Sequence, residues 1–334
     1  MYDNCSRGNE TNVLPKGVVT ADKRKEYSFL AWLRQDDSHK NIFCILGKPG
    51  AGKSTLMRFI ALHGKLRTAL EPWVSGRQLI IAKYFFWNHG EWIQRSLEGL
   101  LRSLLLQILE HHRSLISVAF PRQSWLIGGA KFRFSTDSLL QALDRILDSA
   151  DHKKLKLFFI IDGLDDFNDL EDNVNQTTQE VVIRDFLKRF HDRPCLKLCI
   201  STRPYLSFTK EYGKPGGQCL ALHDLTVDDI KSYVRETLGK NDDFTKMAVK
   251  DGGYENLVNE IVETAAGVFL WVRLACQSLL SGMTNQDHIS DLQHRLRELP
   301  DDLRNLYEHL LRTVPQQYQQ RSARSLLLAS TSFQ

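Results

Sequence analysis

Residues 47–54 read Gly-Lys-Pro-Gly-Ala-Gly-Lys-Ser, and this stretch decides how the rest of the chain is interpreted. An apolar run at 42–46 precedes it, and residues 55–60 continue it with the spacing of a helix. The pattern G-x-x-x-x-G-K-[ST] between a strand and a helix is typical of a loop whose backbone N–H groups wrap the β-phosphate of a nucleotide. The sequence therefore predicts a P-loop and, with it, nucleotide binding.

The residue types of this loop suit phosphate and magnesium chemistry. Side chains in place of its glycines would hinder the approach of the phosphates. Lys53 begins the following helix, whose N-terminal partial positive charge faces the phosphates, and its ammonium can reach the β- and γ-phosphate oxygens. The Ser54 hydroxyl is placed to coordinate Mg²⁺. We therefore expect ATP or ADP, together with Mg²⁺, to contact Gly47, Gly50, Ala51, Gly52, Lys53, Ser54 and Thr55.

The composition is typical of a globular protein of about two domains, with 334 residues, 42% hydrophobic and 25% charged. No apolar run approaches the ~20 residues that span a bilayer, and the N-terminus lacks the pattern of a secretory signal, so we expect a cytoplasmic chain without a membrane span. The net charge of +4, without a dense basic block, gives no argument for nucleic acid as a partner. The six cysteines form no C-x-x-C pair, so we interpret them as reduced thiols and predict no zinc site.

Strands alternate with helices over the first two thirds of the chain. Amphipathic spacing predicts one long helix over 92–109 and further helices over 136–150 and 178–190. This alternation is typical of the α/β class with a doubly wound parallel sheet, here of five strands. The apolar runs place these strands at 41–46, 79–86, 155–161, 196–201 and 219–222.

Beyond residue 225 the strand pattern stops and successive helices follow. The first of them is predicted over 227–238, because Thr226 followed by Asp229 is close to a capping box. The chain is thus expected to divide into a loose polar arm at 1–26, a P-loop domain at 27–224, an all-helical domain at 225–314 and the start of a further, winged-helix-like region at 315–334.

A second motif follows the third predicted strand. Residues 160–166 read Ile-Ile-Asp-Gly-Leu-Asp-Asp, which puts acids at the carboxyl edge of the sheet, where open α/β sheets bind ligands. Asp162 is placed to hold Mg²⁺ opposite Ser54, and Asp165 and Asp166 are candidates to polarise the attacking water. The alternative is a solvated turn, since Asp and Gly end many strands. The upstream P-loop favours the functional interpretation of Asp162.

The fourth predicted strand closes with Ser201-Thr202-Arg203-Pro204. Arg203 therefore puts a fixed cation at the same edge of the sheet. An arginine in this place can sense the γ-phosphate and neutralise the charge that develops during its transfer. The alternative is an ordinary surface arginine after a strand.

In this order, the three motifs resemble those of the NACHT branch of the STAND signal-transduction NTPases. The closer resemblance is to fungal NACHT proteins that carry a nephrocystin-type P-loop module. It is carried by Tyr-Phe-Phe-Trp at 84–87, by the segment 96–105 and by Ala-Gly-Val-Phe-Leu-Trp-Val at 266–272, and it covers residues 27–312.

The resemblance implies a nucleotide-dependent, NLR-like signalling switch. Such a switch rests with ADP, exchanges it for ATP on a signal, self-associates or binds protein partners, and hydrolyses ATP slowly, often in self/non-self recognition or cell death. We expect such association to use the helical domain. The nucleotide and metal roles of the family carry over to Lys53, Ser54 and Asp162, and its sensor position corresponds to Arg203.

Two departures from the family pattern bear on the chemistry. The acidic pair is Asp165-Asp166 where Asp-Glu is usual, which shortens one carboxylate arm and affects hydrolysis more than binding. Gly-Val-Phe at 267–269 stands where related switches have Gly-x-Pro against the adenine, so that contact has no assigned residue. No effector domain or repeat array is readable, and we expect a core module, a truncated gene product or a fragment.

Three other functions compete with the NTPase switch. One is a non-hydrolysing, nucleotide-stabilised scaffold whose helical domain displays a partner surface. Another is a small-molecule kinase, which needs a basic lid, whereas residues 211–218 contain Lys214 as their single cation. The third is binding of single-stranded nucleic acid by the aromatic residues 85–87, which at the end of a strand are more often part of a core.

Overall fold

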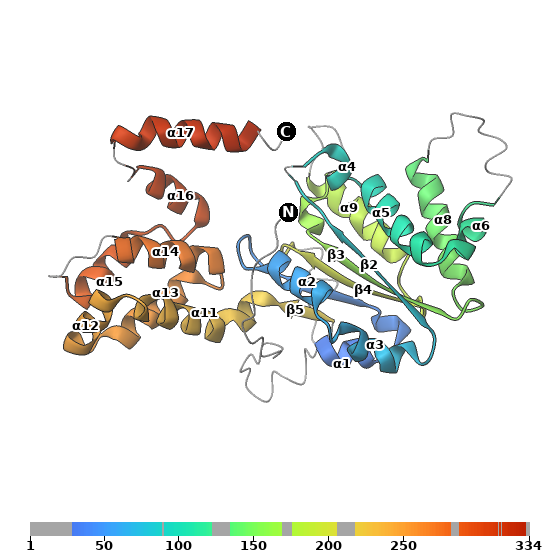
Figure 1. The fold of residues 1–334 in the computed structure, drawn as a ribbon, viewed down its shortest axis with the longest axis horizontal. Coiled ribbons are helices and arrows are strands. Elements are labelled where there is room, and N and C mark those ends of the chain that lie inside the picture. The colour runs from blue at the N-terminus through green and yellow to red at the C-terminus, as the bar shows by residue number, and fades with distance from the viewer. Residues whose placement is uncertain are drawn as a thin grey trace, which may run out of the picture.

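The fold centres on a five-stranded parallel sheet, seen in a computed structural model that describes residues 29–88, 90–121, 134–168, 176–205, 218–281, 287–312, 314 and 316–331 (Figure 1). Every pairing in the sheet is parallel, and the strand order is β2-β3-β4-β1-β5. The predicted doubly wound α/β class is therefore confirmed. The strands are β1 (Ile42–Leu46), β2 (Gln78–Phe85), β3 (Leu155–Asp162), β4 (Leu196–Thr202) and β5 (Cys219–Ala221).

Helices cover both faces of the sheet, as the near-continuous burial of β1, β3 and β4 requires. One face packs against α1 (Phe29–Arg34), α2 (Lys53–Leu62) and α3 (Leu66–Val74) in a core that includes Trp32, Met57 and Trp73. The other face packs against α5 (Leu97–His111), α6 (Ile116–Ala119), α8 (Thr136–Ser149) and α9 (Gln176–Lys188). The alternation of side chains along each strand therefore sends successive residues into two separate cores.

The prediction of a single long helix over 92–109 is wrong, because the helix is interrupted at Ser96. Helix α4 (Trp92–Arg95) ends there, and Ser96 has extended backbone angles of φ −102° and ψ 158°. Its hydroxyl accepts the Gly99 N–H at 3.1 Å, which caps α5. Gly99 also lies so close to Ile93 O that a Cβ at this position would be 1.7 Å from it. The apolar spacing is continuous across the break, so periodicity alone did not show the turn.

Seven helices of the described chain follow the sheet, and the first six of them share a hydrophobic core of their own. Figure 1 shows them to the left of the sheet, with the last one apart from the others. Trp271 is fully buried in this core. The helices are α11 (Leu222–Gly239), α12 (Asp242–Asp251), α13 (Tyr254–Ala265), α14 (Phe269–Ser281), α15 (Ile289–Glu298), α16 (Leu303–Arg312) and α17 (Gln316–Thr331).

The predicted start of the first of these helices is also wrong. Helix α11 begins at Leu222, directly after β5, so Thr226 lies inside it instead of capping it. The Thr226 hydroxyl donates to His223 O at 3.5 Å, within the same helix. The sequence pattern also missed α3 and α12, which lie in stretches interrupted by polar residues and, in α3, by Pro72.

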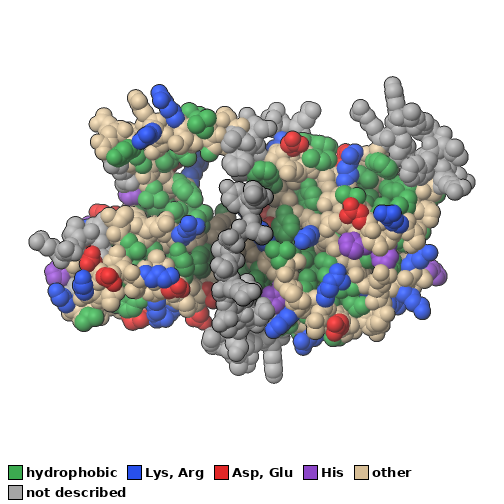
Figure 2. All heavy atoms as spheres, viewed as in Figure 1, with side chains coloured by type: hydrophobic (Ala, Val, Ile, Leu, Met, Phe, Trp, Pro, Cys, Tyr) green, Lys and Arg blue, Asp and Glu red, His purple; other side chains and the backbone are tan. Residues whose placement is uncertain are grey.

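Some predictions fall on residues outside the described part of the chain. These are the polar arm at 1–26 and the segment 211–217 that bears on the kinase alternative. The five described cysteines are buried, and none of them forms a disulfide. None of the described helices has the length and apolar content to cross a bilayer. On the face drawn in Figure 2, Lys and Arg side chains are scattered among Asp and Glu.

Candidate functional site

The P-loop joins the end of β1 to the start of α2. Gly50 and Gly52 have φ angles of +74° and +94°, a region that glycine adopts without steric cost. Gly52 is also the N-cap of α2 and has no side chain to satisfy the free N–H groups of the first turn. These N–H groups therefore stay available to an anion. The Gly47 N–H donates to Thr202 O at 3.3 Å, which holds the start of the loop against the end of β4.

Lys53 folds back over its own loop. Its ammonium donates to Gly47 O at 2.9 Å and to Lys48 O at 3.4 Å, and the residue is 9% exposed. Burial lowers the pKa of Lys53, whereas the nearby carboxylates, Asp165 first among them, raise it. A negatively charged ligand would favour the charged ammonium further, because opposite charges stabilise each other in a partly buried site.

Asp162 ends β3 and is buried beside Ser201 of β4. The Ser201 hydroxyl donates to Asp162 Oδ1 and accepts the Gly163 N–H at 2.9 Å. Gly163 has a φ of +75°, so the chain turns sharply after Asp162. Ser201 was not among the predicted site residues. It is the first polar residue after the apolar run of β4, and this signal is weak because many strands end in serine.

The predicted sensor arginine and the acidic pair lie together. Arg203 Nε donates to Asp165 Oδ2 at 2.8 Å, and the Asp165 side chain is 5% exposed. Asp165 and Asp166 belong to the short 3-10 helix Leu164–Asp166, at the carboxyl edge of the sheet. Burial raises the pKa of Asp166, and the charge of Asp165 raises it further. Asp165 is therefore engaged in an ion pair with Arg203, whereas Asp166 is a carboxyl group whose pKa is raised.

These side chains converge on Lys53. Asp165, Arg203, Asp162 and Asp166 all act electrostatically on its ammonium. The structure therefore brings the three predicted motifs to one edge of the sheet. Thr55 and Ser54, on the first turn of α2, are exposed there.

The donor set suits a hard divalent cation. Asp162 offers a carboxylate and Ser54 a hydroxyl, and oxygen ligands of this kind are those that Mg²⁺ prefers. Asp165 Oδ1 is buried and has no hydrogen-bond partner among the described residues. A buried acceptor without a partner is costly, and a hydrated ligand at this edge would satisfy it. These residues fit a magnesium–nucleotide complex.

Residues of the helical domain also contact the P-loop. The Leu270 N–H donates to Gly50 O at 3.0 Å, and Lys48 Nζ donates to Ala266 O at 3.4 Å. A Cβ at Gly50 would lie 2.9 Å from Leu303 Cδ1 and 3.3 Å from Val268 Cγ1. The sequence placed Leu270 within the segment 266–272 that carries the resemblance, but it did not predict the contact of Leu270 with Gly50 and did not identify Leu303. No local pattern shows that a residue more than 200 positions away packs on a loop.

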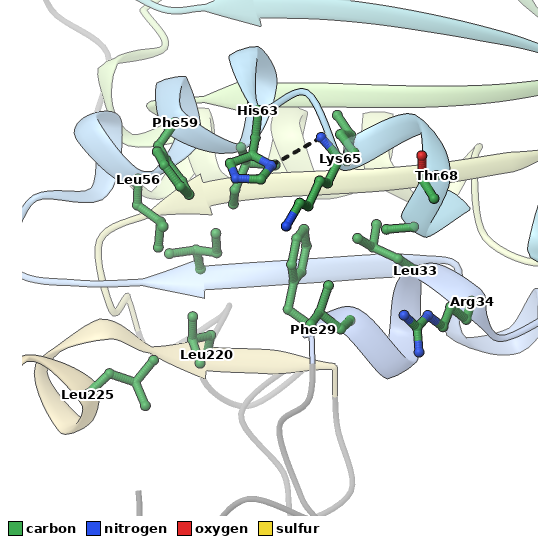
Figure 3. Close-up of a pocket in the computed structure, with 15 residues that line it drawn as sticks. Phe29, Leu33, Arg34, Leu56, Phe59, His63, Lys65, Thr68, Leu220 and Leu225 are labelled. Atoms are coloured by element: carbon green, nitrogen blue, oxygen red, sulfur yellow. Dashed lines mark hydrogen bonds between the residues drawn. The ribbon is translucent and has the colours of Figure 1, made fainter. Parts of the chain in front are cut away.

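A separate cavity of about 360 Å³ lies along α2 (Figure 3). Its walls come from α1, α2, α3, β5 and the start of α11, and are largely apolar, with Phe29, Leu56 and Leu220 among them. At its rim, His63 Nδ1 accepts the Lys65 N–H at 3.2 Å. None of the predicted site residues lines this cavity, so it is distinct from the phosphate site.

Comparisons with known proteins bear on the first part of the chain. The model of a family described as "Nephrocystin 3, N-terminal" matches residues 24–203, which is more than half of the chain. A search of the curated proteins found no match.

Two solved structures are similar to the chain at low identity. One is the structure of Drosophila ORC bound to DNA, with 17% identity over 73% of this chain and 57% of that one, and a TM-score of 0.38. The other is the crystal structure of Cdc6p from Pyrobaculum aerophilum, with 15% identity over 84% of this chain and 66% of that one, and a TM-score of 0.39. The chain thus spans less than two thirds of either.

Proposed function

The chain belongs to the nephrocystin 3 N-terminal family, and from this membership and the site above we propose that it is a magnesium-dependent NTPase of the NACHT type. It binds ATP or ADP on the P-loop, hydrolyses ATP slowly and uses the bound nucleotide as a signalling switch. The observation that supports the proposal most is the convergence of Lys53, Asp162, Arg203 and the acidic pair at one edge of the sheet.

Each group has a role that its position supports. Lys53 exchanges its two loop carbonyls for phosphate oxygens, and Ser54 and Asp162 hold Mg²⁺. When bound, the ion neutralises charge on the β- and γ-phosphates. Arg203 exchanges Asp165 for the γ-phosphate. Asp166 polarises the attacking water, because its raised pKa makes its carboxylate a better proton acceptor than an ordinary aspartate.

The helical domain supplies the switch. Leu270 and Leu303 join Gly50 of the P-loop to α14 and α16, and Ala266, at the end of α13, accepts a hydrogen bond from Lys48. We therefore expect a movement of the helical domain to affect the loop, and the reverse. We assign the sheet domain to 27–224, the helical domain to 225–314 and the start of a winged-helix-like region to 315–334. The motif set supports a role in fungal, NLR-like self/non-self or cell-death signalling, with protein partners or self-association through the helical domain.

The test is binding of ATP and ADP together with multiple-turnover release of γ-phosphate in Mg²⁺. We expect Lys53→Ala to lose nucleotide binding, because the ammonium is the main cation of the loop. We expect Asp166→Asn to bind normally but to lose turnover. Lys240→Ala, on the exposed end of α11, is the control for loss of a positive charge.

Two outcomes would change the proposal. Tight ADP binding without turnover above the variants would leave the nucleotide-stabilised scaffold as the function. Absence of nucleotide binding in the wild type would reject both functions.

A further inference from the structure

Ser201, near the end of β4, contacts Asp162, the last residue of β3. The Ile161 and Ile200 positions are paired in the sheet, so Asp162 and Ser201 follow at neighbouring positions of adjacent strands. Ser201 is fully buried and Asp162 is 2% exposed. Both side chains lie on the α2 side of the sheet, because Ile160 and Cys199, two residues earlier on each strand, pack with Met57 of α2.

The hydrogen bonds of Ser201 have one possible direction. The Gly163 N–H can only donate, so the Ser201 oxygen must accept it, at 2.9 Å. The single hydroxyl proton is then left to donate to Asp162 Oδ1. Ser201 therefore links the backbone turn after β3 to one chosen oxygen of the carboxylate.

This link restricts what Asp162 can do. A carboxylate on a flexible side chain can rotate and present either oxygen or both to a cation. With Oδ1 engaged by Ser201, the carboxylate plane is held, and Oδ2 is the oxygen that remains for a ligand among the described contacts. Hydrogen bonds of this kind orient metal-binding carboxylates and are worth about 10- to 100-fold in metal affinity.

Ser201 and Thr202, which end β4, and Arg203, which follows them, each contact a different part of the site. Ser201 contacts Asp162, Thr202 O accepts the Gly47 N–H, and Arg203 pairs with Asp165. The end of β4 is therefore the element that sets the spacing between the P-loop and the acids. Of these contacts, the one made by Ser201 bears directly on a metal ligand.

We propose that Ser201 is a positioning residue for magnesium, and that its hydroxyl holds Asp162 in the orientation in which one carboxylate oxygen faces the ion. The proposal rests on the proposed nucleotide function. It does not give Ser201 a contact with nucleotide or with the reacting atoms.

Thr202 provides a matched control in the same strand. Its side chain is fully buried like that of Ser201, but alternation places it on the opposite face of the sheet. Its hydroxyl has no hydrogen-bond partner among the described residues. Thr202→Val therefore removes a buried hydroxyl from the end of β4 without touching Asp162.

The experiment measures Mn²⁺ binding to the ADP complex by electron paramagnetic resonance, and ADP binding in EDTA as a separate readout. We expect Ser201→Ala to weaken Mn²⁺ binding about tenfold or more and to leave ADP binding in EDTA unchanged. We expect Ser201→Thr, which keeps the hydroxyl, and Thr202→Val to stay within about threefold of the wild type.

Several results would overturn the proposal. One is wild-type Mn²⁺ affinity in Ser201→Ala. Another is an equal loss of ADP binding in EDTA, which would make the role of the hydroxyl structural. If Ser201→Ala does not fold, Ser201→Cys replaces it, and unchanged Mn²⁺ affinity with this weaker donor would count against the proposal. Failure of the wild type to bind ADP at all would instead reject the proposed function.

Discussion

At the scale of single residues, the site has two acids of the same type in different surroundings. Asp165 is ion-paired with Arg203, whereas Asp166 is half-buried and has a raised pKa through burial and the neighbouring carboxylate. A general base works best when its pKa approaches the working pH. The shorter side chain in place of the usual glutamate is thus offset in part by an environment that makes the carboxylate more basic.

This difference predicts the pH dependence of hydrolysis. Asp166 must be ionised to accept a proton, so turnover should rise with pH through its folded pKa. Because that pKa is raised, the acid limb should lie above the usual range of an aspartate. Initial rates of γ-phosphate release across the acidic range test this. If Asp166→Asn retains measurable turnover with the same acid limb in its pH–rate profile, the titration belongs to another group.

At the scale of elements, a buried lysine of the sheet forms hydrogen bonds with α1. Lys197 of β4 donates from Nζ to Trp32 O and, at 3.1 Å, to Leu33 O, both near the end of α1. The ammonium also lies 4.9 Å from the centre of the Trp32 ring and 5.1 Å from that of Trp73. Two of the last carbonyls of α1 therefore accept hydrogen bonds from a side chain of the sheet.

The lowered pKa of Lys197 should make the stability of the fold depend on pH. Burial lowers the pKa of Lys197 to about 7, from 10.5 in the unfolded chain. Between these values the unfolded state holds a proton that the folded state lacks, so the free energy of unfolding should rise with pH across this window. The rise is at most about 1.4 kcal/mol per pH unit for one group.

Denaturant unfolding of the wild type and of Lys197→Met at several pH values measures this contribution. The difference between the two free energies of unfolding should grow with pH from about 7 to about 10. A difference independent of pH would show that Lys197 keeps its charge when folded.

At the scale of the whole molecule, the P-loop lies between the sheet and the helical domain. Gly50 contacts Leu270 of α14 and approaches Leu303 of α16, while Gly47 is held by the end of β4. Gly50 also has a positive φ, so a side chain there would be strained as well as crowded. Motion of the helical domain and release of nucleotide should therefore be coupled.

The contact made by Leu303 tests this coupling. We expect Leu303→Ala to speed ADP dissociation about threefold or more, because it removes the side chain nearest to Gly50 and loosens the helical domain on the loop. Leu311→Ala, on the exposed face of the same helix, is the control. Stopped-flow release of a fluorescent ADP analogue measures the rate. Equal rates in the two variants would show that α16 does not restrain the loop.

Local patterns predicted much of the fold and part of the site. The apolar runs located all five strands to within two residues, because buried parallel strands are apolar nearly throughout. The same signal failed at two helix ends. At Ser96 a capping serine ends one helix and begins the next, although the apolar spacing continues across it. At Leu222 the helix begins directly after β5, five residues earlier than the apolar spacing predicted.

The sequence by itself determined the α/β class, the P-loop, and the placement of Asp162, Asp165, Asp166 and Arg203 at strand ends, because these follow from spacing along one stretch of chain. The tertiary structure alone decided that Arg203 pairs with Asp165, that Ser201 holds Asp162, and that Leu270 contacts Gly50. The physical reason is that such contacts depend on which strands are neighbours and on how two cores pack, and no local pattern records either.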